Sequence, residues 1–173
     1  KRLPITTEYL REKKVIFIDR DGVLNVKAPQ ADYIKSWNEF KWILGAKESL
    51  ALLTKKGYEV IIITNQAGIA RGKMSELDLK IIHQNMKQDV KESGGKIAAI
   101  YYCPHGWDDG CDCRKPKPGM ILQAKKDFRF KLNNTYFIGD DIRDAQAGNE
   151  AGCKTIIILK NESLLEVVKN KII

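Results

Sequence analysis

The sequence contains no apolar run long enough to cross a membrane. Its longest apolar runs span only a few residues, as at 155–159, whereas a membrane-spanning helix needs about 20. No apolar signal segment lies near Lys1. The first residue is not Met, so we expect the natural start to lie upstream of Lys1. From these absences we predict a protein of the cytoplasm with no membrane partner.

The composition also lacks the bias of a disordered chain. Hydrophobic residues make up 43% and charged residues 30% of the 173 residues, which is typical of folded proteins. That length fits one domain that buries its own core. We predict a polar N-terminal tail at 1–14 and a single domain at 15–173, and we expect a monomer.

The chain carries a net positive charge, but its basic residues are not concentrated in one segment. Lys and Arg number 30 against 22 Asp and Glu, for a formal net charge of +8. The basic residues are spread along the chain in pairs such as Lys13-Lys14 and Lys125-Lys126, and no basic stripe alternates with aromatic residues. The pattern favours a solvated surface over a nucleic-acid-binding face.

Short apolar runs alternate with segments of helical spacing along the whole chain. Strands are expected at 15–18, 59–63, 97–102, 136–138 and 155–159, and helices at 46–56, 75–92, 120–127, 144–151 and 163–171. Ser75, followed three residues later by Asp78, predicts an N-cap for the second helix. The alternation predicts an α/β fold, with a Rossmann-like parallel sheet and helices on both faces.

Polar residues that can take part in catalysis or ligand binding follow the expected strands. Asp19-Arg20-Asp21-Gly22 follows the first strand, Thr64-Asn65 the second, and Gly139-Asp140-Asp141 the fourth, with Asp144 beyond. Arg114-Lys115 follows a loop after the third strand. Because ligands of open parallel sheets bind at the carboxyl ends of the strands, we expect these residues to meet at one edge.

So many carboxylates in a small space need a cation to offset their repulsion. A hard, oxygen-liganded dication such as Mg²⁺ suits them and leaves positions open for phosphate oxygens. Lys115 and the hydroxyl of Thr64 add a positive charge and a donor for a phosphoryl group. The combination predicts phosphoryl transfer to an aspartate nucleophile.

A second cluster combines the scarce cysteines with one of only two histidines. Four potential ligands, Cys103, His105, Cys111 and Cys113, fall within eleven positions. Two disulfides are the alternative for four cysteines, but a reducing compartment and this spacing favour a closed, structural Zn²⁺ site. We expect the fourth cysteine, Cys153, in the core, and His83 on the surface of a helix.

The motifs together resemble the haloacid dehalogenase (HAD) superfamily of phosphohydrolases over nearly the whole chain. Within it, the segments 19–25, 64–72 and 113–120, together with the Cys/His loop, are similar to the heptose-bisphosphate phosphatases. The histidinol-phosphate phosphatases are close relatives of that group. Only 42 residues separate Asp21 from Thr64, and 50 separate Thr64 from Lys115, which leaves no room for the cap domain of many relatives.

The resemblance implies a role for each motif residue. Asp19 would be the nucleophile and Asp21 the general acid and base, with Thr64, Asn65 and Lys115 stabilising the phosphoryl group. Arg114 would bind a second phosphate of a sugar bisphosphate, with further substrate contacts from the loop of Lys27 and Gln30. The residues implied for Mg²⁺ are Asp19, Asp21 through its backbone carbonyl, Asp140 and, flanking them, Asp141, with Asp144 as an orienting residue.

Other functional interpretations of the same residues stay open at this point. After Asn25 the segment 27–34 departs from the common heptose-bisphosphate pattern, which weakens the assignment of the sugar. Histidinol phosphate and the 3′-phosphate of a nucleic-acid end are alternative substrates. A zinc-stabilised binding module is the alternative that is not an enzyme. A response-regulator receiver domain is disfavoured, because its phosphorylated Asp lies between the acid pair and the Thr.

Overall fold

The computed structural model describes residues 12–173, which form a five-stranded parallel sheet. The strands, in the order β3-β2-β1-β4-β5 across the sheet, are β1 (Lys14–Ile18), β2 (Tyr58–Asn65), β3 (Ile97–Cys103), β4 (Tyr136–Gly139) and β5 (Lys154–Ile157). The predicted parallel sheet is confirmed. Most of the expected tail lies outside the described residues, and Lys14 already pairs with Tyr58 as the first residue of β1.

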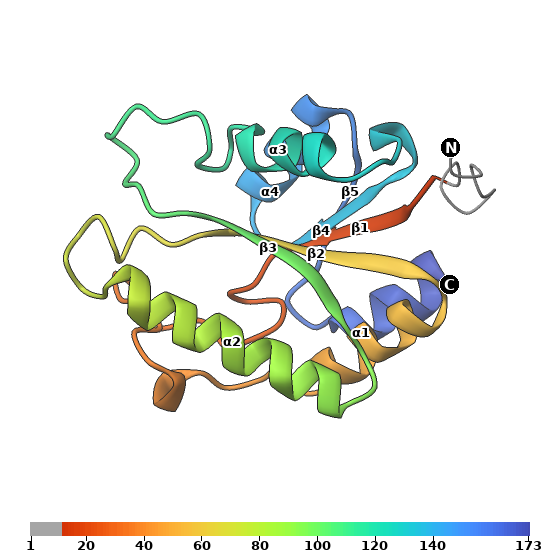
Figure 1. Cartoon of the computed structure of the whole chain (residues 1–173), viewed down its shortest axis with the longest axis horizontal. Coiled ribbons are helices and arrows are strands. Elements are labelled where there is room, and N and C mark those ends of the chain that lie inside the picture. Colours follow the sequence, from red (N-terminus) through yellow and green to blue (C-terminus); the bar gives the residue numbers. More distant parts are fainter. Residues whose placement is uncertain (1–11) are drawn as a thin grey trace, which may run out of the picture.

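Helices cover both faces of this sheet, as predicted. Figure 1 shows α1 and α2 on one side and α3 and α4 on the other. The helices are α1 (Ala46–Lys55), α2 (Glu76–Glu92), α3 (Gly119–Asp127), α4 (Ile142–Ala151) and α5 (Leu164–Val167). The expected helix at 163–171 is instead α5 followed by a π-helical segment, Val168–Ile172. Among residues 12–173, no helix has the length and apolar character needed to span a bilayer.

Helix caps explain where two of the helices begin. Ser75 caps α2 in a reciprocal capping box with Asp78, as the sequence predicts. The helix expected to begin at Asp144 begins at Ile142, because Asp141 forms a second capping box with Asp144. This cap ties the acidic residues after β4 to a rigid helix.

Alternate strand residues divide the core into two layers. Ile16 and Ile18 of β1 pack in the layer under α1 and α2, whereas Val15 and Phe17 pack in the layer that includes α3 and α4 residues. Burial on both faces explains the continuous apolar runs of the sequence. Cys153 lies in the core as predicted, but His83 is only 8% exposed, so its predicted surface position is wrong.

The sheet order creates the crevice that positions the site. The chain runs from β1 to β2 and β3 on one side and then returns to β4 on the other side of β1. The loops after β1 and β4 therefore separate at a topological switch point, where open α/β sheets bind ligands. Within residues 12–173, the 19–45 connection is a loop with a short turn, Trp37–Glu39, rather than a cap domain.

Candidate active site

A buried ion pair joins Asp19 and Lys115, which lie 96 positions apart in the sequence. Asp19 directly follows β1, is 7% exposed, and its backbone N–H donates to the carbonyl of Ile138 in β4. The Lys115 Nζ donates to Asp19 Oδ1 at 2.8 Å and to the carbonyl of Ile63 at 3.0 Å. A buried lysine with these partners stays charged, because both carboxylate charge and hydrogen bonds raise its pKa against burial.

Asp144 orients the cluster from the first turn of α4. One carboxylate oxygen accepts from Lys115 Nζ at 2.6 Å. The other accepts from the backbone N–H groups of Asp140 and Asp141, at 3.1 and 3.2 Å. Its oxygens are thus engaged by protein donors, which supports the predicted orienting role.

The carboxylates of Asp19, Asp140 and Asp144 approach one another closely enough to share a cation. One oxygen from each lies within 4.8 Å of the others. Burial and the nearby charges of Asp144 and Asp140 raise the pKa of Asp19 to about 8, although Lys115 opposes the shift. A hard dication beside Asp19 would reverse that effect, because it favours the ionised form.

An unpartnered oxygen gives this cluster its strongest sign of a metal. Asp140 Oδ1 is buried and has no hydrogen-bond partner among the described residues, a state that is costly for a carboxylate oxygen. The other oxygen, Oδ2, is bound by Lys27 Nζ at 2.7 Å. The residues therefore fit an oxygen-liganded dication at Asp19 and Asp140.

Asp21 is held by three donors on one side of this cluster. Arg20 and the Asn25 amide donate to its Oδ1 at 2.7 and 2.9 Å, and the Gln66 amide donates to its Oδ2 at 2.9 Å. Burial disfavours the carboxylate, but the charge of Arg20 and these hydrogen bonds hold its pKa below the usual range. Asp21 is thus a rotationally fixed carboxylate facing the cleft.

The residues at the carboxyl end of β2, Thr64 and Asn65, hold the site together from the opposite side. Asn65 and Lys115 exchange two hydrogen bonds, at 3.1 Å and 3.0 Å, between the Asn65 amide and the Lys115 backbone. The Thr64 hydroxyl is buried and accepts from the Gln66 amide at 3.0 Å. Asn65, predicted to contact the phosphoryl group, is therefore seen to fix the position of Lys115.

The site opens into a cleft of about 420 Å³. Besides Lys115 at its base, three cationic residues line it, Lys27, Arg114 and Arg143. The predicted substrate residues Lys27, Gln30 and Arg114 all lie in this lining. A cleft with carboxylates at its base and cations on its walls suits a substrate with more than one phosphate.

Asp141 differs in position from the other acidic residues. Its carboxylate caps α4 and accepts from the Arg143 guanidinium at 3.0 and 3.2 Å. Hydrogen bonding to Arg143 lowers its pKa to about 2. It is not part of the three-carboxylate group of Asp19, Asp140 and Asp144, so the geometry does not support its predicted place beside the metal.

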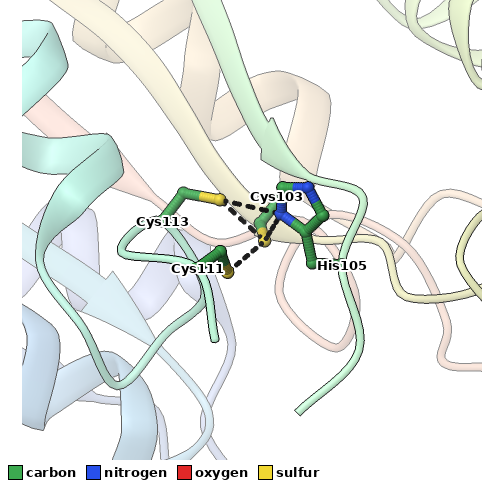
Figure 2. A group of neighbouring side chains, drawn as sticks. All are labelled: Cys103, His105, Cys111 and Cys113. Carbon is green, nitrogen blue, oxygen red and sulfur yellow. Dashed lines mark hydrogen bonds between the residues drawn. The ribbon is translucent and has the colours of Figure 1, made fainter. Parts of the chain in front are cut away.

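The Cys/His loop brings its four predicted ligands to one point. Figure 2 shows Cys103, His105, Cys111 and Cys113 with their donor atoms turned towards one another. Cys103 Sγ lies 3.5 Å from His105 Nδ1 and 3.6 Å from Cys111 Sγ, and Cys113 Sγ lies 3.4 Å from His105 Nδ1. The Cys113 and Cys103 sulfurs lie closer together, at 2.9 Å. Ligands roughly 2.3 Å from a tetrahedral centre stand about 3.8 Å apart, so a Zn²⁺ ion would separate this pair, whereas the other three separations and the three thiols with one imidazole fit it.

This loop leads directly into the active site. Arg114, next to Cys113, donates to the carbonyl of His105 at 3.3 Å. The backbone N–H of Gln66 donates to the carbonyl of Cys103 at 2.8 Å. A rigid loop therefore fixes Arg114 and Lys115 relative to the β2 end.

Sequence reasoning missed four residues of this network: Arg20, Asn25, Gln66 and His83. Gln66 directly follows Thr64-Asn65, so its place at a strand end was the available signal. Arg20 stands between two acidic residues, which indicated proximity but not burial. Nothing in the local sequence of His83 indicated that its imidazole would reach Arg20, 63 positions away.

Comparisons with known proteins agree with this geometry. A family model described as polynucleotide kinase 3 phosphatase matches residues 14–164. The chain belongs to this family. It is also 40% identical over 146 residues to the D-glycero-beta-D-manno-heptose-1,7-bisphosphate 7-phosphatase of Pseudomonas aeruginosa, covering 84% of this chain and 81% of that protein.

Solved structures place the fold in the HAD superfamily. The D,D-heptose 1,7-bisphosphate phosphatase of B. bronchiseptica, complexed with magnesium and phosphate, superposes with a TM-score of 0.84 at 34% identity, over 90% of this chain and 96% of that one. A HAD-superfamily hydrolase of Geobacter sulfurreducens has the same fold, with a TM-score of 0.63 at 12% identity, over 91% and 98%. This family member is a HAD-type phosphoric monoester hydrolase, as the motifs predict.

Proposed function

We propose that the chain removes the C7 phosphate of D-glycero-D-manno-heptose 1,7-bisphosphate through an aspartyl-phosphate on Asp19. The observation that most supports this proposal is the position of the Asp19 carboxylate. Lys115 Nζ donates to its Oδ1 at 2.8 Å, and the unpartnered Oδ1 of Asp140 belongs to the same acidic cluster. The heptose-bisphosphate relatives support the sugar, and the cations of the cleft suit a second phosphate.

Mg²⁺ would be held by Asp19, Asp140 and the backbone carbonyl of Asp21. When bound, it supplies positive charge that ionises Asp19 and offsets the charge of the phosphate oxygens. Lys115 and the Thr64 hydroxyl stabilise the same phosphoryl group as it transfers. Arg114, with Lys27 and Gln30 on the cleft wall, binds the second phosphate and the sugar.

Two steps complete the hydrolysis. In the first, an Asp19 oxygen attacks phosphorus, the bond between phosphorus and the C7 oxygen breaks, and Asp21 gives its proton to that leaving oxygen. In the second, water attacks the phosphoryl group, Asp21 takes its proton, and inorganic phosphate leaves Asp19. The charge of Arg20 and the hydrogen bonds of its three donors hold the pKa of Asp21 low in the free protein. The negative charge of a bound phosphate shifts that pKa upwards, towards the protonated form that the first step uses.

The zinc cluster bears on where the protein works. Four protein ligands leave Zn²⁺ no open position, so it serves the loop and not the chemistry. Thiolates that must stay reduced to bind metal suit a reducing compartment, and we place the protein in the cytoplasm. A monomer stays a prediction.

A phosphate-release assay tests the substrate. We would compare kcat/KM for both anomers of heptose 1,7-bisphosphate, the corresponding 7-phosphate, which keeps the reacting phosphate but lacks the second one, and histidinol phosphate, with Mg²⁺ present. We expect a preference of at least about tenfold for a bisphosphate, because one added ionic contact contributes about 1.5–3 kcal/mol. Comparable turnover of histidinol phosphate and no preference for a bisphosphate would sink the substrate assignment.

The matching family model is described as polynucleotide kinase 3 phosphatase, so the same assay should include a nucleic-acid 3′-phosphate as a second class of substrate. An oligonucleotide with a 3′-phosphate tests it directly. The net charge of +8 favours binding of a polyanion, but the cations that line the cleft are few and local. We expect turnover of the oligonucleotide far below that of the sugar bisphosphate.

A further inference from the structure

Arg20 is a fully buried cation between two catalytic aspartates. Its exposed fraction is 0%, and a buried guanidinium is stable only when its charge and its donors are matched. One terminal nitrogen, NH2, donates to Asp21 Oδ1 at 2.7 Å. The Phe40 ring lies 5.9 Å from its Cζ, and its Nε has no hydrogen-bond partner among residues 12–173.

The other terminal nitrogen of Arg20 meets His83. The NH1 atom lies 3.2 Å from His83 Nε2. A guanidinium can only donate, so Nε2 must accept and the ring is neutral with its proton on Nδ1. Burial, with the charge of Arg20, also lowers the pKa of His83 to about 3, which agrees with a neutral acceptor.

The contact links α2 to the active site across the core layer. His83 stands mid-way along α2, beside the buried residues Ile82 and Met86. Its outer side borders a groove on the surface of α2 and β3, where the Tyr102 ring lies 6.1 Å from the imidazole. The imidazole thus borders this surface groove and also contacts the buried guanidinium.

We propose that His83 is a positioning residue for proton transfer by Asp21, acting through Arg20. The imidazole holds NH1, so that NH2 keeps one orientation against Asp21 Oδ1. Without that acceptor, the buried NH1 would lack a partner and the guanidinium would turn to find one. Asp21 would then lose its charged donor and keep only the amides of Asn25 and Gln66. The inference rests on the proposed function, because it assumes that Asp21 is the acid.

The test compares two leaving groups. His83→Leu removes the acceptor at similar bulk, and His83→Gln returns an acceptor oxygen. A sugar phosphate needs a proton at its leaving oxygen, whereas 4-nitrophenyl phosphate does not. We would measure single-turnover formation of the aspartyl-phosphate from each substrate, with Met86→Leu as a packing control on the same helix.

We expect His83→Leu to lower the rate of aspartyl-phosphate formation from the sugar phosphate about tenfold. This loss is part of the ~10²–10⁴-fold rate acceleration that a general acid supplies. The rate with 4-nitrophenyl phosphate should change less than about threefold, and the substrate concentration that gives half of the maximal single-turnover rate should stay the same. His83→Gln should restore the sugar-phosphate rate, and Met86→Leu should leave both rates unchanged. If His83→Leu does not fold, His83→Met, which also lacks a strong acceptor, takes its place.

Equal losses with both substrates, or equal losses in the Leu and Gln variants, would overturn the positioning role and indicate packing alone. An unchanged rate in His83→Leu would overturn it as well. If the unsubstituted protein turns over neither phosphate ester, the proposed function itself has failed, so the two failures are distinguishable.

Discussion

At the residue scale, the site depends on side chains that are each held by more than one partner. Lys115 contacts Asp19, Asp144 and the carbonyl of Ile63, and Asp21 accepts from three donors. Such redundancy fixes the positions of the reacting groups before substrate arrives, which is the condition for efficient electrostatic stabilisation. Single substitutions should therefore separate chemistry from folding.

Asp19→Asn should abolish turnover. An amide cannot attack phosphorus as a carboxylate does, so we expect kcat to fall by far more than about 10³-fold, since removing the nucleophile of a serine protease costs about 10⁶ in kcat. The substitution removes a buried charge that burial and Asp144 already disfavour, so the melting temperature should not fall sharply. Thermal unfolding, zinc content and phosphate release measure these three outcomes, and activity near that of the unsubstituted protein would exclude Asp19 as the nucleophile.

Gly22→Ala tests how closely the β1 loop approaches Asp140. Gly22 has φ +86°, and an added Cβ would lie 2.1 Å from Asp140 Oδ2. Strain of about 1–2 kcal/mol follows from the positive φ alone. The displaced carboxylate should also weaken Mg²⁺ binding and lower activity.

Gly57→Ala is the matched control for Gly22→Ala. Gly57 has φ +88°, but an added Cβ would meet nothing within 4 Å. We expect a similar loss of unfolding free energy with an unchanged Mg²⁺ dependence of kcat. If both alanine variants keep the Mg²⁺ dependence, the close approach of Gly22 has no functional effect.

At the element scale, the loops after the strands carry function and the helices fix them. The capping box of Asp141 and Asp144 starts α4 at the exact place where its first turn reaches Lys115. The Cys/His loop does the same for Arg114 and Lys115, with no helix of its own. A metal held by the cluster would replace the hydrogen-bonded rigidity that regular structure supplies elsewhere.

Cys111→Ser should therefore affect activity only through the loop. We expect loss of zinc, a lower melting temperature, and a reduced kcat/KM that reflects misplaced Arg114 and Lys115. Cys153→Ser is the control, because Cys153 is a buried cysteine outside the cluster. Unchanged zinc content and melting temperature in Cys111→Ser would refute a structural zinc site.

At the scale of the whole molecule, the parallel sheet gathers carboxylates that come from β1 and β4. A dication that bridges Asp19 and Asp140 would join two strand ends and stabilise the folded state by mass action. The gain is about 2.7 kcal/mol at a hundredfold excess over Kd, or about 5–10 °C for a chain of this size.

Asp140→Asn should abolish this stabilisation. We expect Mg²⁺ to raise the melting temperature of the unsubstituted protein and of Glu150→Gln, which changes an exposed carboxylate on α4. Thermal unfolding with and without Mg²⁺ measures the difference. An equal Mg²⁺-dependent shift in Asp140→Asn would place the ion elsewhere.

The fold and the identity of the main site residues could be read from local patterns. The strands β1, β2 and β4 are short apolar runs with polar residues at or just after their carboxyl ends, and both features are encoded within a few positions. The Cys/His spacing likewise carries its ligand set within eleven residues. The start of α4 was predicted two residues too late, at Asp144 instead of Ile142. The sequence did not show that the Asp141 side chain caps the helix while it also accepts from Arg143.

Sequence alone thus determined the sheet, the acidic edge, the lysine and the cluster of Cys103, His105, Cys111 and Cys113. Only the tertiary structure decided that Asn65 anchors Lys115 and that His83 reaches a buried Arg20. The reason is physical. Buried donors and acceptors must find partners, and in a parallel sheet the nearest partner often belongs to a crossover connection far away in the sequence.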